Sequence, residues 1–195
     1  MPITTRALAA LALAPAMLLA ACNEATGEGE KAAVSADADP GSQTLAVALG
    51  RADDLGTIKS AVASAGLSTL FDGPASYTLL APNDAAFTAL GERGKALMQP
   101  EQKALLVAVL RNHLVPGHLT REAIDKAIAA KGGKVTMTTL GEGRISFAKE
   151  GDTILVTTDE GGSAKLAPGE AAASNGVVLP LDAVLLPRET TAAAQ

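Results

Sequence analysis

Apolar residues recur every three or four positions in the first part of the chain, which is typical of helices. Residues 44–65 carry two such stripes, Leu45, Ala48 and Leu49, and then Leu55, Ile58, Val62 and Ala65. Asp53 and Asp54 interrupt the pattern between them, so it predicts two helices. Gly66 follows the second stripe and is expected to end that helix, because glycine readily adopts the left-handed conformation found at helix C-termini.

The next segment predicts a strand that runs into a short helix. Residues 77–80 form the strand, which we expect Pro82 to end. Either Asn83 or Asp84 can cap a helix over residues 85–90, because a side-chain oxygen there accepts from the free N–H groups of the first turn.

Two more helices are predicted after residue 99. Pro100 suits the first turn of one helix, which we expect Pro116-Gly117 to close. The inward stripe of that helix is Leu106, Val109, Leu110 and His113. Thr120 is expected to cap a last helix over residues 121–130.

Beyond residue 133 the pattern changes to that of strands. Short β-branched runs are separated by glycine-containing turns, at residues 135–140, 145–149, 153–158 and 163–167. This spacing predicts a meander of hairpins. Asn175-Gly176 is a further turn signal, and residues 177–186 supply the last strands. Helices followed by strands indicate the α+β class, with the helices in the N-terminal half.

The first residues indicate a targeting signal. Arg6 precedes an apolar run that ends Leu-Ala-Ala-Cys22, and this end resembles a bacterial lipoprotein cleavage site. We therefore expect residues 1–21 to be a lipoprotein signal peptide and Cys22, the only cysteine, to carry the lipid. Asn23, where an Asp would favour the inner membrane, favours anchoring at the outer membrane of a bacterial cell envelope, on its periplasmic or its surface face.

Composition separates a tether from a folded domain. Residues 22–42 are rich in Ala, Gly, Glu and Asp and cannot bury enough apolar surface to fold, so we expect a flexible tether. The folded domain is expected at 43–188 and a disordered tail at 189–195. The chain has a net charge of −5, most of it in the tether, and no basic run, which excludes nucleic acid as a partner. Three Phe, one Tyr and no Trp leave little for stacking on bases or sugar rings.

Three separated segments, at residues 77–87, 112–117 and 175–187, together resemble the fasciclin (FAS1) domain. The chain departs from the pattern at four positions, where Asn83 replaces Thr, Asn112 replaces Tyr, Leu179 replaces His and Pro180 replaces Val. The resemblance implies a compact wedge of about seven strands in two sheets capped by helices. It also implies a binding or adhesion module and not an enzyme.

The motif residues are expected to have structural roles: Asn83, Asp84, Phe87, His113, Pro116, Gly117, Asn175, Gly176 and Asp182. His113 lies on an apolar helix face, so its ring must find a partner inside, which we expect to be Asp84 or Asn83. Asp182 is interpreted as a turn or backbone acceptor. Pro180 cannot donate to a sheet, so its strand is expected at an edge or bulged.

The sequence offers no catalytic, metal or cofactor site. The single cysteine belongs to the signal, no Gly-x-Ser-x-Gly occurs, and the two histidines lack zinc-site spacing. We therefore expect a lipid-anchored module that binds an envelope protein or polysaccharide, anchored to the membrane only through Cys22. The alternative is a carrier for an apolar small molecule, a pigment or a lipid, in a groove of the aliphatic wedge.

Overall fold

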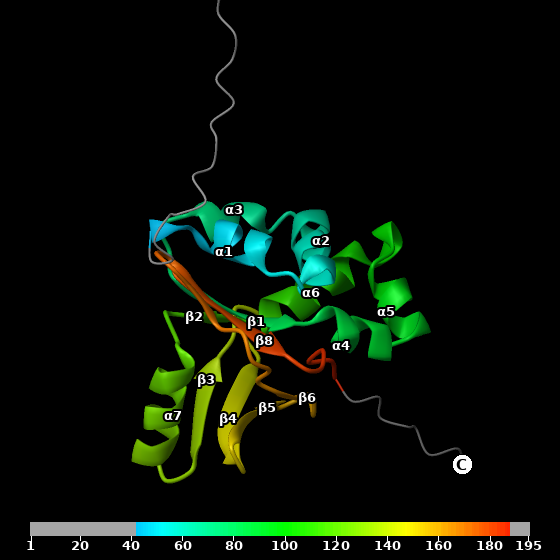
Figure 1. Cartoon of the computed structure of the whole chain (residues 1–195). Coiled ribbons are helices and arrows are strands. Elements are labelled where there is room, and N and C mark those ends of the chain that lie inside the picture. The colour runs from blue at the N-terminus through cyan, green and yellow to red at the C-terminus, as the bar shows by residue number, and fades with distance from the viewer. Residues whose placement is uncertain (1–41, 188–195) are drawn as a thin grey trace, which may run out of the picture. The chain divides into compact units, whose positions relative to one another are not determined.

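Two four-stranded β-sheets, named here sheet A and sheet B, lie at the centre of residues 42–187, the part of the chain that this computed structural model describes (Figure 1). Sheet A has the strand order β2-β1-β8-β7 and sheet B the order β3-β4-β5-β6. The predicted α+β class with two sheets is confirmed. The described residues form eight strands, in agreement with the expected number of about seven.

The helices are α1 (Leu45–Arg51), α2 (Gly56–Ala65), α3 (Ser68–Asp72), α4 (Asp84–Ala89), α5 (Glu92–Leu97), the 3-10 turn η2 (Pro100–Gln102), α6 (Lys103–Asn112) and α7 (Arg121–Ala130). The strands are β1 (Tyr77–Pro82), β2 (Leu114–Pro116), β3 (Lys134–Thr138), β4 (Arg144–Glu150), β5 (Thr153–Thr158), β6 (Ser163–Lys165), β7 (Ala171–Ala173) and β8 (Gly176–Leu181).

Local signals account for most helix ends. Gly66 ends α2 in the left-handed conformation with φ 76°, as predicted. Thr120 caps α7 through its side-chain oxygen, which accepts from Ala123 N at 3.1 Å. The open choice for α4 is resolved in favour of Asn83, whose Oδ1 accepts from Ala86 N at 2.8 Å.

The prediction that one helix continues to Pro116-Gly117 was wrong. The helix α6 ends at Asn112, and residues 114–116 pair with β1 as the antiparallel strand β2. A strand of three residues is too short to show a period of its own, and the apolar stripe of the preceding helix runs into it. The short helices α3 and α5 and the strand β7 were missed for the same reason.

Sheet B is the predicted meander. All its neighbouring strands are antiparallel, and each is joined to the next by a glycine-containing turn. The helix α7 packs against β3 and β4. Because successive side chains of a strand point to opposite faces, every second residue of sheet B points toward sheet A and the others point away from it.

Sheet A has a parallel pair at its centre, and both of its faces are covered. The strands β1 and β8 pair in parallel, and every residue of β8 is buried. Figure 1 shows α1, α2, α3 and α6 on one side of sheet A, with sheet B and α7 on the other. Parallel strands buried on both faces have nearly continuous apolar sequences, as the run Gly-Val-Val-Leu-Pro-Leu of β8 does.

The expectation that Pro180 lies on an edge strand was wrong, since β8 is a central strand. Pro180 pairs in register with Ala81 of β1 and does not interrupt that register. Strand β7 reaches only to Val178, and beyond it the Pro180 carbonyl accepts from Ala167 N at 2.8 Å. The N–H and C=O of a strand residue point to the same side, which at Pro180 is the side away from β1, so the pairing of β8 with β1 needs no N–H at this position.

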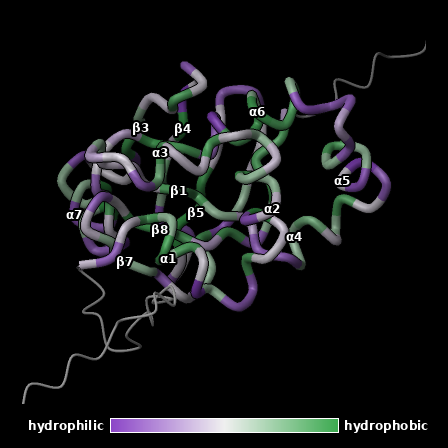
Figure 2. Tube along the Cα trace, turned by 90° about the horizontal axis from the view of Figure 1, so that it is seen from above, coloured by the Kyte–Doolittle hydropathy of each residue, from purple (hydrophilic) through white to green (hydrophobic). Residues whose placement is uncertain are grey.

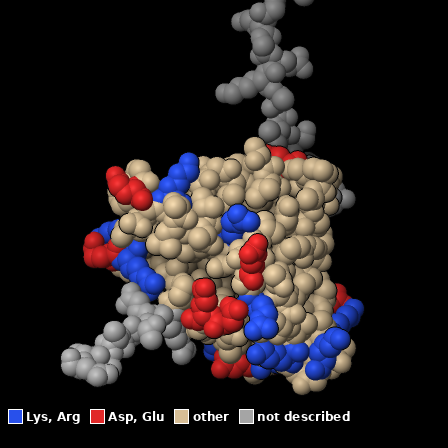
Figure 3. Space-filling view, turned by 180° about the vertical axis from the view of Figure 1, so that it is seen from behind, with Lys and Arg blue, Asp and Glu red and all other residues tan. Residues whose placement is uncertain are grey.

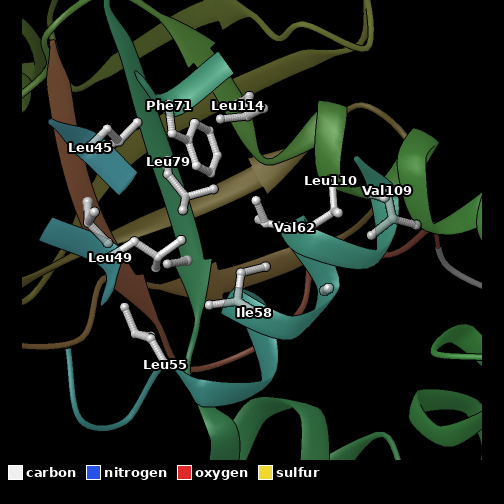
Figure 4. Packing of buried hydrophobic residues seen from close by; sticks show 14 of the residues in the cluster. Leu45, Leu49, Leu55, Ile58, Val62, Phe71, Leu79, Val109, Leu110 and Leu114 are labelled. Carbon is white, nitrogen blue, oxygen red and sulfur yellow. The ribbon is translucent and has the colours of Figure 1, made fainter. Parts of the chain in front are cut away.

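Two apolar clusters fill the spaces on either side of sheet A. Leu79 and Val178 face the helices, whereas Leu80 and Val177 face sheet B and α7. Figure 4 shows Leu79 directed toward the side chains of the helical layer, among them Phe71. Figure 2 shows hydrophobic positions concentrated around β1 and β8 and hydrophilic ones toward α5 and α7. The core is mainly aliphatic, as the composition predicted, and includes the three phenylalanines Phe71, Phe87 and Phe147.

Candidate functional site

The three motif segments become three neighbouring strands of sheet A together with the chain just beyond them. Strand β1 lies between β2 and β8, and these strands belong to the three segments in turn. Backbone bonds tie them further, from Leu80 N to the His113 carbonyl at 2.9 Å and from Asn83 N to the Leu181 carbonyl at 3.0 Å. The motif is therefore one connected unit inside the domain.

His113 is the buried polar centre of this unit. Its side chain is only 1% exposed, and its Nε2 lies 3.0 Å from Leu185 N while its Nδ1 lies 2.8 Å from the Val109 carbonyl. An amide N–H can only donate, so Nε2 is the unprotonated acceptor and Nδ1 carries the proton that it donates. The expectation that His113 contacts Asp84 or Asn83 was wrong, since it ties α6 to the C-terminal segment.

Burial holds His113 in this neutral form. It lowers the pKa of His113 to about 4, and the bond to Val109 opposes this shift only in part. A proton on Nε2 would face the N–H of Leu185, so the charged ring could not keep that bond. The arrangement suits a structural tie and not a general base, which needs access to a substrate.

Asp84 joins the motif to α2. Its carboxylate accepts from Thr57 N at 2.7 Å and from Gly56 N at 3.2 Å, which are free donors at the N-terminus of α2. The bonds from the Thr57 hydroxyl and backbone N–H have the largest effect and lower the pKa of Asp84. Burial opposes them, and the Gly56 N–H and the charge of Lys59 add to the lowering. Phe87, one turn further on, is buried in the cluster beneath the helices.

Asn175 connects the end of the chain to its beginning. Its Oδ1 accepts from Leu45 N at 2.7 Å, and its Nδ2 donates to the carbonyls of Phe71 and Gly73 at 2.9 and 2.7 Å. The side chain therefore satisfies the N-terminus of α1 across 130 positions of sequence. At Gly176 a Cβ atom would collide with the carbonyl of Tyr77, so β1 and β8 approach each other only because the residue is glycine.

The remaining motif residues lie at turns on the surface. Pro116 is exposed at the end of β2, and Gly117 has φ 105° and donates to the Ser76 carbonyl at 2.9 Å. Asp182 Oδ1 accepts from Lys165 N at 2.6 Å, which places it as a backbone acceptor. The expected signal peptide and Cys22 lie outside the described residues, as does the expected tail. Of the expected tether, only its last residue, Ser42, is described.

Residues 42–187 hold no group of three or more His, Cys, Asp or Glu side chains that could bind a metal ion. Within the same range no helix is both long and apolar enough to cross a bilayer.

Two hollows flank the helical layer. One, of about 520 Å³, has a mainly apolar lining: Thr57, Phe87, Thr88, Gly91, Gly94, Lys95, Met98 and Gln99. The other, of about 580 Å³, is more polar and includes Arg111, Asn112, Glu142 and Glu160. Sequence reasoning missed both hollows, because α5 was not predicted and because the turn beside Asn112 comes from a distant part of the chain.

The fold and sequence match known proteins. The profile of the family described as "Fasciclin domain" matches residues 53–187. A solved FAS1 domain pair from the insect cell adhesion molecule fasciclin I superposes with a TM-score of 0.64 at 14% identity. That match covers 75% of this chain and 51% of the other, and at this identity it shows the fold alone.

Two curated relatives are similar in sequence. Protein sll1483 of Synechocystis is 29% identical over 162 residues, which are 81% of this chain and 82% of the relative. Transforming growth factor-beta-induced protein ig-h3 of Sus scrofa is 29% identical over 137 residues, 69% of this chain and 18% of the relative. The chain thus spans most of the bacterial relative and about a fifth of the animal one.

Proposed function

This chain belongs to the fasciclin domain family, a family associated with cell adhesion, and on that premise we propose that it is a lipid-anchored binding module of a bacterial cell envelope. It recognises an envelope protein or a polysaccharide and contributes to adhesion or to the organisation of the envelope. Fasciclin domains are in general adhesion modules and not enzymes.

The observation that carries the proposal is that the polar motif residues are already engaged within the fold. His113, Asp84 and Asn175 all bond to backbone groups of distant segments. A catalytic group must instead reach a substrate. Because these polar residues serve the fold, we propose that the module recognises its partner through its outer surface.

The anchor is proposed from the sequence at residues 1–22. Acyl chains contribute about 0.8 kcal/mol per buried methylene, so a multiply acylated Cys22 would hold the domain stably at a membrane. A tether over residues 22–42 would then leave the domain free to meet a partner beyond the bilayer. The outer membrane, on its periplasmic or surface face, is the proposed address.

The experiment combines anchoring with partner capture. A photo-reactive amino acid placed at Leu105, which is 52% exposed on α6, or at Asp152 in the β4–β5 turn should give adducts with an envelope component only on irradiation. In parallel, Cys22→Ser should move the protein from the membrane to the soluble fraction. Membrane-bound protein that yields no adduct at either position would contradict the binding function. Retention of Cys22→Ser in the membrane would contradict the anchor.

A carrier function is the second candidate, and the apolar hollow beside Phe87 and Met98 favours it. Purified protein would then bring with it a pigment or lipid that is detectable by absorbance or mass spectrometry. The substitution Thr88→Trp, at an exposed position on the rim of this hollow, should displace such cargo. Protein that purifies without cargo speaks against this alternative.

A further inference from the structure

The outward face of sheet B carries a row of hydroxyl groups that crosses all four strands. Thr136 pairs with Ser146, Ser146 with Thr157, and Thr157 with Ser163. Directly opposed residues of neighbouring strands point to the same face, so the four side chains stand in one line. With strands about 4.8 Å apart the row is about 14 Å long. Thr136 Oγ1 and Ser146 Oγ lie 2.9 Å apart and share one hydrogen bond.

Cationic side chains flank this row on the same face. Lys134 and Lys165 stand at the two ends of the adjacent row, whose middle members are Ala148 and Leu155. Lys165 is paired with Glu150 at 2.9 Å. Lys134 is exposed and makes no ion pair with any described residue. We name Lys134, Thr136, Arg144, Ser146, Thr157 and Ser163 the hydroxyl face.

Part of the hydroxyl face is hollowed. A depression of about 310 Å³ is lined by Lys134, Thr136, Arg144, Ser146, Thr157, Thr158 and Asp159. Its volume is at the lower end of the roughly 300–1,000 Å³ of small-molecule sites. Arg144 Nε is 3.8 Å from Asp159 Oδ2, a loose contact between exposed groups that leaves the guanidinium able to bind elsewhere.

The hydroxyl face has no packing role in the described part of the chain. The buried apolar residues of sheet B, among them Ile145, Phe147 and Val156, point to the opposite side, toward sheet A and α7. Its charge also contrasts with that of the chain, since two cations and one carboxylate line the hollow of a protein with net charge −5. Figure 3 shows several Lys and Arg side chains gathered toward the end of the domain that holds sheet B.

We propose that the hydroxyl face binds a segment of an acidic polysaccharide. Sugar carboxylates pair with Lys134 and Arg144, and sugar hydroxyls exchange hydrogen bonds with Thr136, Ser146 and Thr157. This inference rests on the proposed binding function and names the partner class and the surface within it.

The chemistry of the face favours this occupant over others. The cores of protein–protein interfaces are enriched in aromatic residues, whereas the outward side of sheet B has no aromatic side chain and only Ala148 and Leu155 as apolar ones. Binding without stacking fits a face that lacks aromatic side chains. A neutral sugar would leave the unpaired Lys134 unused, whereas a carboxylate adds a charge-assisted hydrogen bond.

The test uses the full chain purified in detergent and measures its affinity for polygalacturonate and for the methyl-esterified, uncharged polymer. We expect binding of the acidic polymer only, weakening as salt screens the exposed charges. Lys134→Glu replaces an attraction by a repulsion and should weaken binding about five- to tenfold. Lys103→Glu, the matched charge reversal at an exposed position at the start of α6, should change it less than about twofold.

A second variant tests the hydroxyls without changing charge. Thr136→Val together with Thr157→Val keeps the side-chain shape and a good strand propensity, so the fold should persist with an unchanged melting curve. Binding should nevertheless fall several-fold. The proposal would be overturned if Lys134→Glu and Lys103→Glu weakened binding equally, or if the double variant bound as well as wild type. It would also be overturned if the esterified polymer bound as well as the acidic one, or if neither polymer bound. Photo-adducts at Leu105 or Asp152 in that case would leave the general binding function standing.

Discussion

Because His113 is buried in its neutral form, we expect the domain to lose stability as the pH is lowered through a defined range. The pKa of His113 is lowered to about 4 in the folded protein by burial, against a value of 6.5 for the unperturbed side chain. Between these two pH values the unfolded chain binds a proton that the folded domain does not. The free energy of unfolding therefore rises with pH across the window and is lost as pH falls.

The magnitude follows from the width of the window. Each pH unit inside it is worth about 1.4 kcal/mol, so acidification from above 6.5 to 4 should remove about 3 kcal/mol. That is a large part of the roughly 5–15 kcal/mol that stabilises an ordinary domain. At a typical dependence of about 2 kcal/mol per molar urea, the midpoint would move by about 1.5 M.

The assay is urea unfolding followed by circular dichroism between pH 7.5 and 4.5, for wild type and His113→Gln. The variant should lose about 1–3 kcal/mol at neutral pH, because the Leu185 N–H and the Val109 carbonyl lose their partner, and it should then show a shallower pH dependence. His118→Gln, at the exposed histidine of a loop, is the matched control and should keep the wild-type stability at neutral pH. Parallel pH profiles for wild type and His113→Gln, or an unchanged neutral stability, would refute the reasoning.

Three further substitutions test the other ties of the motif by thermal and urea unfolding. Asp84→Asn removes the charged acceptor at the start of α2 and should lower the free energy of unfolding by about 1–2 kcal/mol. Since the pKa of Asp84 is lowered from 3.8, its contribution to stability is present above that pH. The difference in stability between wild type and the variant should therefore shrink as the pH falls below 3.8. Asn175→Ala leaves three backbone groups without their partner and should cost roughly 2–4 kcal/mol, and a loss below 1 kcal/mol would show that water replaces the side chain. Gly176→Ala should prevent folding, because the added Cβ atom collides with the Tyr77 carbonyl. Gly50→Ala, in an open part of α1, should instead stabilise the domain by about 0.5–1 kcal/mol. Equal effects of the two substitutions would contradict the close approach of β1 and β8.

Residues with a local cause were predictable. The helices α1, α2 and α7 have apolar stripes, and Gly66 and Thr120 end or begin their helices by bonds within a few residues. The meander of sheet B followed from alternating β-branched runs separated by glycine. In each case the pattern that reveals the element lies within the element.

Residues whose partners are distant in the sequence could not be placed from the sequence. His113 was correctly expected to be inside, but its partner Leu185 is 72 positions away and is a backbone N–H, which leaves no trace in side-chain type. The same holds for the central position of Pro180, which depends on where β7 ends. The alternation of each strand of sheet B predicts which side chains point outward, but the alignment of Thr136, Ser146, Thr157 and Ser163 depends on strand register.

The interior of sheet A and the outward side of sheet B are constrained by folding to different extents, and this difference suits the binding function proposed above. Sheet A is covered on both faces. Substituting His113 or Asn175, which directly precede its strands β2 and β8, leaves backbone groups of other segments unpaired, so these side chains are constrained by folding. On the outward side of sheet B, Thr136 and Lys134 are exposed and Thr136 bonds only to its neighbour Ser146, so exchanging either residue alters the surface and hardly the interior. A partner preference can therefore change on sheet B at little cost in stability, and that is the place where recognition is physically easiest to build.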